Sequence, residues 1–176
     1  DHSRWPTIRV TQEDTAGNYG LFAGLSAIAL DAYLGDTTAL ARDWQVFTGY
    51  GDGSWPFRKT ASWSSAWSCV PDTGTSRLPI AINPDCADRS GAPVEDASRS
   101  AYPSASTYIH EATAPLVVQA LLLEAAGYPA WQVNDRQVCR VVAFADRVSR
   151  LVDHSVAFYV PWIANAKCGT DYGTRT

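Results

Sequence analysis

The chain has 176 residues, of which 46% are hydrophobic and 18% are charged, and its formal net charge is -4 at pH 7. A chain of this length and composition is expected to form a domain with a hydrophobic core rather than a disordered tail. The acidic balance gives no electrostatic reason to expect nucleic acid as a partner. No apolar run is long enough to cross a membrane.

The first predicted elements are two helices that form a hairpin. Apolar residues at three- and four-residue spacing predict a helix over Thr15–Leu34. Gly35 is a natural C-terminal stop, and Asp36 can cap a second helix over Thr37–Phe47. The residues expected on the buried faces of these helices are Phe22, Leu25, Ile28, Ala29, Ala32 and Tyr33 in the first and Leu40, Trp44 and Phe47 in the second.

The middle of the chain, from Thr48 to Pro103, is predicted to be a loop-rich insertion. Glycine, proline and serine are frequent there, and its tryptophans follow no helical period. One short helix is expected around Ser62–Trp67. Connections of this length are uncommon in compact domains unless they are functional or cross-linked.

Helical spacing returns after the insertion. A helix is predicted over Ser104–Ala126, and Gly127 ends it. Pro115 lies inside this segment and removes one backbone donor. The helix therefore either kinks at Pro115 or truly begins there, after Thr113.

Two more helices complete the predicted set. Asn134–Val152 is expected to be helical, and Gln137, three residues after Asn134, gives its start the form of a capping box. A last short helix is expected over Val156–Ala166, limited by Pro161 and closed by Gly169.

Successive helical hairpins without convincing strand alternation predict an all-α fold. Such hairpins are the units of an (α/α) toroid, and a complete toroid has more than the roughly five or six helices predicted here. We therefore expect residues 1–176 to form a single helical domain, an incomplete (α/α) toroid of antiparallel hairpins with a loop-rich insertion at 48–103. This domain would be the C-terminal part of a larger toroid, and the N-terminal part of the same protein would be its partner.

Four cysteines, at positions 69, 86, 139 and 168, indicate two disulfide bonds. They form no C-x-x-C pair, which argues against a zinc site or a thioredoxin-like motif. Three connectivities are possible, and we favour Cys69–Cys86 within the insertion and Cys139–Cys168 between a helix and the tail. The alternative is four buried free thiols. Disulfides predict an oxidising compartment and hence a secreted, extracellular protein.

Two groups of polar residues have the chemistry of an acid–base site. Asn18 and Tyr19 lie near the start of the first predicted helix, where free backbone N–H groups favour anions. Arg99, Tyr108 and His110 lie around the start of the helix that follows the insertion. Arginine can bind a carboxylate with two hydrogen bonds, and tyrosine or histidine can move a proton. Both groups also fit structural roles, namely a solvated helix face and a surface ion pair.

Residues elsewhere predict sugar contacts. Trp55 lies in the insertion, whereas Trp162 and Asn165 lie in the last predicted helix. These side chains can stack on and hydrogen-bond a sugar ring, or they can serve as core and cap. No two histidines have the spacing of metal ligands, and the chain has no nucleophile elbow or phosphate-binding loop. We therefore expect neither a metal nor another cofactor.

Three segments resemble alginate-lyase-like polysaccharide lyases. Gly17–Asp36, with Asn18 near its start and Leu-Gly-Asp at its end, resembles an asparagine-containing helix of these enzymes. Val94–Arg99, with Tyr108 downstream, resembles their acidic-x-x-x-Arg segment and the tyrosine that follows it. The residues that resemble the closing pattern of the family are Leu116–Tyr128, Trp131, Pro161, Trp162, Gly169 and Thr170. The resemblance covers most of the chain except the tryptophan-rich insertion.

The resemblance implies β-elimination on an acidic, uronic-acid-containing polysaccharide by an (α/α) toroid. It assigns Asn18 and Arg99 to the substrate carboxylate and Tyr108 to the proton transfers, and stabilisation of the enolate-like charge would carry much of the rate. The family commonly has histidine directly after the motif asparagine, whereas this chain has Tyr19. Either Tyr19 is a family variation, His110 supplies the imidazole, or the site is inactive.

Two other functions stay open. A non-catalytic glycan-binding or structural domain would bind sugar through its tryptophans. An inverting glycoside hydrolase of the same architecture would use two carboxylates that face each other across a cleft, chosen from Asp14, Asp52 and Glu95. The tryptophans in question are Trp55, Trp63, Trp67 and Trp162.

Overall fold

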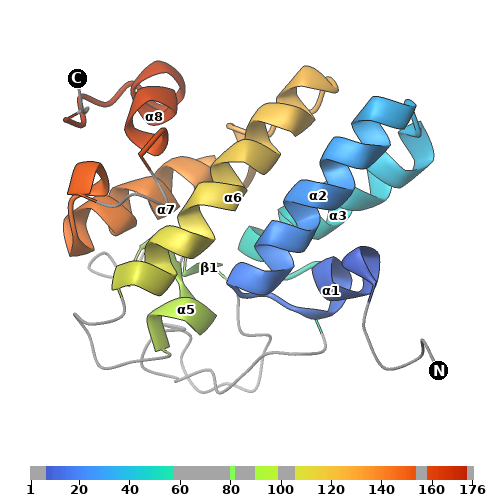
Figure 1. Cartoon of the computed structure of the whole chain (residues 1–176), viewed down its shortest axis with the longest axis horizontal. Coiled ribbons are helices and arrows are strands. Elements are labelled where there is room, and N and C mark those ends of the chain that lie inside the picture. The colour runs from blue at the N-terminus through green and yellow to red at the C-terminus, as the bar shows by residue number, and fades with distance from the viewer. Residues whose placement is uncertain (1–6, 58–79, 82–89, 99–105, 154–157, 174–176) are drawn as a thin grey trace.

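The computed structural model describes residues 7–57, 80–81, 90–98, 106–153 and 158–173. This part of the chain is mostly helical, with one short antiparallel strand pair (Figure 1). The predicted helical fold class is therefore confirmed, whereas the toroid arrangement stays a prediction. In chain order the elements are α1 Ile8–Asp14, α2 Asn18–Leu34, α3 Thr37–Asp52, β1 Ile80–Ala81, β2 Ala92–Pro93, α5 Val94–Ser98, α6 Ser106–Ala125, α7 Val133–Val148, the 3-10 turn Leu151–Asp153 and α8 Val160–Cys168.

The turn between α2 and α3 matches its prediction. Gly35 ends α2 with a φ of 68°, a left-handed conformation that glycine adopts without a steric penalty. The side chain of Asp36 then accepts a hydrogen bond from the backbone N–H of Ala39 at 3.0 Å. This contact satisfies one of the donors that a helix start leaves unpaired. The two helices therefore form the expected hairpin.

Helix α2 packs along α6, and its buried face differs from the predicted one. The α6 side chain Gln119 donates a hydrogen bond to the backbone oxygen of Leu21 at 2.6 Å. A Cβ at Gly24 would lie only 2.8 Å from the Gln119 amide nitrogen, so glycine allows this close approach. Phe22 and Tyr33, which were expected inside, are 43% and 88% exposed. Because α2 is apolar on all sides, spacing alone could not select its buried face.

Helix α1 was not predicted as a separate element, and polar contacts hold it in place. Thr7 caps it by accepting from the backbone N–H of Val10. Arg9 then donates to Asp31 of α2 and, at 2.7 Å, to Asp43 of α3. Seven residues are too few for a helix to persist alone. The ion pairs with α2 and α3 therefore explain why α1 forms.

Helix α3 continues to Asp52, beyond the predicted end at Phe47. Its glycines are sites of close packing rather than helix breaks. A Cβ at Gly49 would lie 2.3 Å from Cβ of Trp55, and a Cβ at Gly51 would lie 2.2 Å from Oε1 of Gln137. The predicted insertion therefore starts with five helical residues and was placed too early.

Pro115 lies inside a continuous α6. The helix spans Ser106–Ala125, so it neither begins at Pro115 nor is divided there. Proline has no N–H to donate to the carbonyl of Glu111, four residues earlier. The missing bond is tolerated because α6 is the central helix, packed against α2, α5, α7 and α8.

The expected capping box at the start of α7 is wrong. Asn134 is not the N-cap, and it lies in a left-handed turn with Asp135 and Arg136. Its side-chain nitrogen donates to Oε1 of Gln137 at 2.9 Å and to the carbonyl of Thr48 in α3 at 2.7 Å. The bond to Thr48 joins α7 to α3. Asn134 therefore makes a contact with a distant helix instead of capping its own helix.

The C-terminal disulfide prediction is confirmed. Cys139 of α7 and Cys168 of α8 are bonded, and their Cα atoms are 5.6 Å apart. Helix α8 begins at Val160, has Pro161 in its first turn and ends at Gly169 in a left-handed conformation. The predicted Cys69–Cys86 bond and the predicted helix at 62–67 lie outside the described residues.

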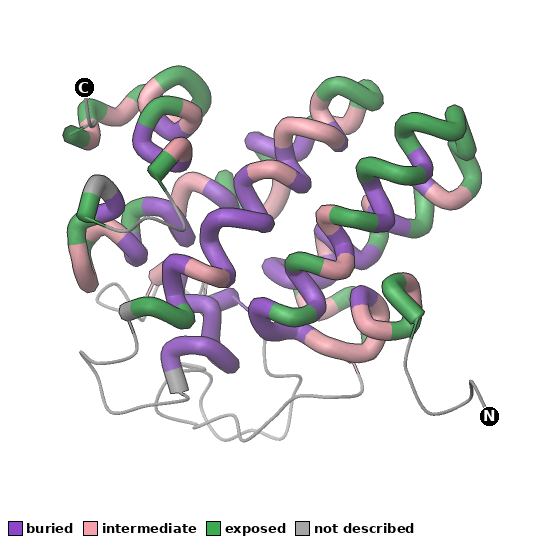
Figure 2. Tube along the Cα trace, viewed as in Figure 1, coloured by how far each residue is buried: buried purple, intermediate pink, exposed green. Residues whose placement is uncertain are grey.

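The short strand pair positions α5. Ile80 pairs with Pro93 and Ala81 with Ala92, and β2 leads directly into α5. Gly91, with a φ of 88°, allows the chain to pass against the backbone of α7, where a Cβ would lie 1.9 Å from the carbonyl oxygen of Arg140. The described side chains of α5 are all buried (Figure 2). A five-residue helix is thus fixed in the core beside the start of α6.

Candidate functional site

The candidate site is built at the N-terminal end of α2. Asn18 is the first residue of this helix and is only 5% exposed. Its side-chain nitrogen donates to Oε2 of Glu111 in α6 at 2.9 Å, and its side-chain oxygen accepts from the backbone N–H of Tyr19 at 3.0 Å. Both ends of the amide are therefore held. The second hydrogen of the amide nitrogen can still be given to a ligand.

The first turns of α6 place Tyr108 near this amide. Tyr108 and Glu111 are three residues apart, and residues at this spacing are neighbours on a helix surface. Tyr108 is 40% exposed, so its phenol group can meet a bound molecule. Glu111 thus connects the two predicted site residues, Asn18 and Tyr108, although it had no assigned role. The separation of 93 positions between Asn18 and Glu111 explains why sequence spacing did not reveal the contact.

His110 occupies a different position. It lies in the same turn of α6 but is 0% exposed, and it points into the core of the protein. A side chain buried in this way does not reach a polysaccharide on the surface. Its position favours support of the helix start over direct proton transfer to a substrate.

A further carboxylate, from Glu95 of α5, lies at the start of α2. Glu95 and Asp96 are buried, and the Glu95 carboxylate packs directly on Gly17, the N-cap of α2. A Cβ at position 17 would lie 2.5 Å from the carboxylate carbon, so any side chain there would displace Glu95. The sequence identified Glu95 as a candidate carboxylate, whereas nothing in its pattern indicated that it lies beside Gly17.

Tyr50 of α3 completes the polar cluster. Burial raises the pKa of its phenol above the ordinary value, and the negative charges of Glu95 and Asp96 raise it further. The phenol oxygen is buried, and it has no hydrogen-bond partner among the described residues. Tyr50 was not predicted as a site residue, and it was expected in the loop-rich insertion rather than in α3.

The structure does not bring every predicted site residue to this place. Arg99 directly follows α5 but lies outside the described residues. Tyr19 is exposed beside Asn18. Trp162 and Asn165 belong to α8, which lies on the far side of α6 from the start of α2 (Figure 1).

Asn165 has a structural partner already. Its side-chain oxygen accepts from the Thr170 hydroxyl and the Tyr172 backbone N–H, and its nitrogen donates to the Tyr172 carbonyl. These bonds pin the segment after α8, so the amide has little capacity left for a sugar.

The carboxylates proposed for a hydrolase are also dispersed. Asp14 ends α1, Asp52 ends α3 and accepts from the backbone N–H of Ser54, and Glu95 is buried in α5. Within the described residues, no group of three or more histidine, cysteine, aspartate or glutamate side chains is placed to hold a metal ion. In the same part of the chain, no helix has both the length and the apolar character of a membrane span.

The chain was compared with protein families, curated proteins and solved structures. No protein-family model, curated protein or solved structure matches the chain.

Proposed function

We propose that this domain belongs to a polysaccharide lyase that cleaves a uronic-acid-containing polysaccharide by β-elimination. One observation supports the proposal: the Asn18 amide of α2 donates to Glu111 of α6, and Tyr108 lies three residues before Glu111 on the same helix. Asn18 begins α2 and Tyr108 lies in the first turn of α6. An amide donor beside a phenol is the pair of groups that this reaction requires.

The reaction removes the C5 proton of a uronate and breaks the bond to the O4 leaving group. The free N–H of Asn18, with Arg99, donates to the substrate carboxylate and stabilises the negative charge that develops on it. Tyr108 accepts the C5 proton as its phenolate and returns a proton to the leaving oxygen. The leaving fragment gains a new reducing end. The other fragment carries an unsaturated uronic acid at its new non-reducing end.

The acidic surroundings make Arg99 essential to this mechanism. Glu95 and Glu111 both lie at the start of α2, and two carboxylates there repel a uronate. The dipole of α2 offsets part of this repulsion, and the proposed mechanism assigns the rest to Arg99. We therefore expect replacement of Arg99 to be more damaging than replacement of any other basic residue.

The same carboxylates support a second candidate, a glycoside hydrolase. The observation in its favour is the buried Glu95 next to Gly17, because inverting hydrolysis needs carboxyl groups held in fixed positions beside the substrate. A hydrolase produces new reducing ends without an unsaturated product. The lyase is preferred because Tyr108 is exposed while Glu95 is not.

The proposal extends to architecture and location. The helical hairpins are part of an incomplete (α/α) toroid whose remaining helices come from the N-terminal part of the same protein. The Cys139–Cys168 bond favours an oxidising, extracellular compartment, where polysaccharide substrates occur.

The test is incubation of the full-length protein, including the N-terminal part that would complete the toroid, with alginate, glucuronan and a glycosaminoglycan while the ultraviolet absorbance of the unsaturated product is recorded. Tyr108→Phe should lower the rate by about 100-fold or more, because it removes the proton-transfer group. Tyr33→Phe, at the exposed far end of α2, is the matched control and should not change the rate. Absence of the absorbance signal with all three polymers refutes the lyase, and new reducing ends without absorbance would favour the hydrolase.

A further inference from the structure

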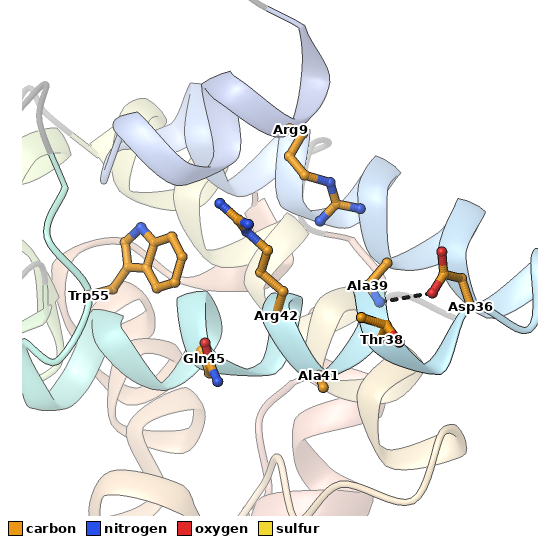
Figure 3. A pocket seen from close by; sticks show the side chains of 8 residues that line it. All are labelled: Arg9, Asp36, Thr38, Ala39, Ala41, Arg42, Gln45 and Trp55. Atoms are coloured by element: carbon orange, nitrogen blue, oxygen red, sulfur yellow. Dashed lines mark hydrogen bonds between the residues drawn. The ribbon is translucent and has the colours of Figure 1, made fainter.

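An open groove with a volume of about 680 Å³ runs between α1 and α3, and Asn18, Tyr108 and Glu111 are not among its lining residues. Figure 3 shows Trp55 at one end of the groove, Asp36 at the other, and the guanidinium groups of Arg9 and Arg42 between them. The remaining lining residues are Thr38, Ala39, Ala41 and Gln45.

The two arginines are held rigidly. Arg42 donates to Oε2 of Glu13 at 2.8 Å, and its Nε forms an ion pair with Oε1 of the same carboxylate at 2.6 Å. Arg9 divides its donors between Asp31 and Asp43. A guanidinium group has five N–H donors, so each arginine keeps donors for a ligand. Because the carboxylates already fix these side chains, a ligand does not have to order them on binding.

Trp55 gives the groove a fixed aromatic end. Its indole N–H donates to the backbone oxygen of Glu13 at 2.9 Å, and its Cβ packs on Gly49. The Arg42 guanidinium carbon lies 5.8 Å from the centre of the indole ring. The indole therefore stays in one orientation, as a stacking surface requires.

The charges around the groove argue against an anionic ligand. The positive charges of Arg9 and Arg42 are matched by Glu13, Asp31 and Asp43, and Asp36 adds another carboxylate. A carboxylate or phosphate gains no net attraction at such a place. A sugar hydroxyl, in contrast, can accept from a guanidinium group and donate to a carboxylate at the same time.

We propose that this groove binds an uncharged, hydroxyl-rich sugar unit of a carbohydrate chain, stacked on Trp55 and hydrogen-bonded by Arg9 and Arg42. This binding does not depend on β-elimination. Trp55 is nevertheless connected to the candidate site, because Phe57 donates to the Trp55 carbonyl and stacks on Tyr50 at 5.0 Å. A heteropolysaccharide that combines uronic acids with neutral sugars is therefore a better fit than a polymer of uronic acids alone.

The experiment is isothermal titration of the whole chain with hexasaccharides of glucose, mannose and xylose and with a hexamer of mannuronate. At least one neutral hexasaccharide should bind, and Trp55→Ala and Arg42→Gln should each raise its Kd by about tenfold. Phe158→Ala, an exposed aromatic residue just before α8, is the matched control and should leave the Kd unchanged. Circular dichroism checks that each variant is folded, and Trp55→Phe replaces Trp55→Ala where the alanine variant is not.

Three results would overturn the proposal. In the first, no neutral hexasaccharide binds. In the second, the Trp55 and Arg42 variants bind with the same Kd as the wild type. In the third, the Kd depends on Trp55 only when the ligand is the mannuronate hexamer. The outcome is separable from the lyase test. If the groove does not bind neutral sugars, the protein can still cleave short uronates and give the absorbance signal. If the protein is not a lyase, the absorbance signal is missing but neutral sugars still bind in the titration.

Discussion

The side chain of Asn18 donates a hydrogen bond to the carboxylate of Glu111 at 2.9 Å, and this bond joins the start of α2 to α6. The amide oxygen of Asn18 accepts from the neighbouring backbone N–H, so rotation of the amide by half a turn would break both bonds. The orientation of Asn18 is therefore decided by a residue distant in the sequence.

Glu111→Ala should release the Asn18 amide. We expect kcat/KM on the polysaccharide to fall by about tenfold, the equivalent of one lost hydrogen bond to a charged group. Glu111→Gln keeps an acceptor at the same place and should restore most of the rate. Equal rates for wild type and Glu111→Ala, measured well below the unfolding temperature, would show that Asn18 does not need this support.

Gly17→Ala should destabilise the fold. A Cβ at this position would lie 2.5 Å from the carboxylate carbon of buried Glu95, and overpacking of this kind costs about 1–3 kcal/mol in free energy of unfolding. Urea unfolding measures the change. Ser26→Ala, on the exposed face of α2, is the control and should change stability by less than about 0.5 kcal/mol. An unchanged midpoint for Gly17→Ala would contradict the packing of Glu95 on Gly17.

The Asp43 carboxyl should make stability depend on pH. Its pKa is raised from 3.8 to about 6, because burial and the neighbouring Asp31 raise it by more than Gln12 and Arg9 lower it. The folded state thus holds a proton more tightly than the unfolded state, so stability is greatest below pH 4 and falls as the pH rises to about 6. The fall should be on the order of 2 kcal/mol.

Asp43→Asn tests this assignment because asparagine keeps an oxygen acceptor for Gln12 and Arg9 but does not titrate. In this variant, the unfolding temperature measured between pH 4 and pH 7 should lack the fall that Asp43 causes in the wild type. The exposed Asp52→Asn is the control and should retain the slope of the wild type. Identical pH profiles for wild type and Asp43→Asn would refute the raised pKa.

Replacement of both Cys139 and Cys168 by serine should lower the free energy of unfolding by about 3–4 kcal/mol. The bond closes a segment with a sequence separation of 29, and the entropy of the unfolded chain rises when this closure is lost. Denaturant unfolding of the double variant measures the loss and, unlike a reductant, does not affect the other two cysteines. A loss below about 1 kcal/mol would mean that α8 is held mainly by packing.

Local chemistry in the sequence was sufficient for several features. Glycine at positions 35 and 169 ends its helix in a left-handed conformation, as expected. The Cys139–Cys168 bond also agrees with its prediction. The glycine stops depend only on residues within one helical turn. The disulfide depends on a choice among three possible cysteine connectivities. The sequence pattern was therefore enough to predict both.

The tertiary structure decided what spacing could not. Helix α2 is apolar all round, and its buried face was chosen by the small Gly24 and by Gln119 of α6. The candidate site likewise combines residues that sequence motifs identified with residues that only the packing of helices placed. The motifs selected Asn18 and Tyr108, but only the packing of α2, α5 and α6 placed Glu95 and Glu111 beside them. Helix starts and stops are encoded locally, whereas contacts between distant helices depend on which side chains fit together in three dimensions.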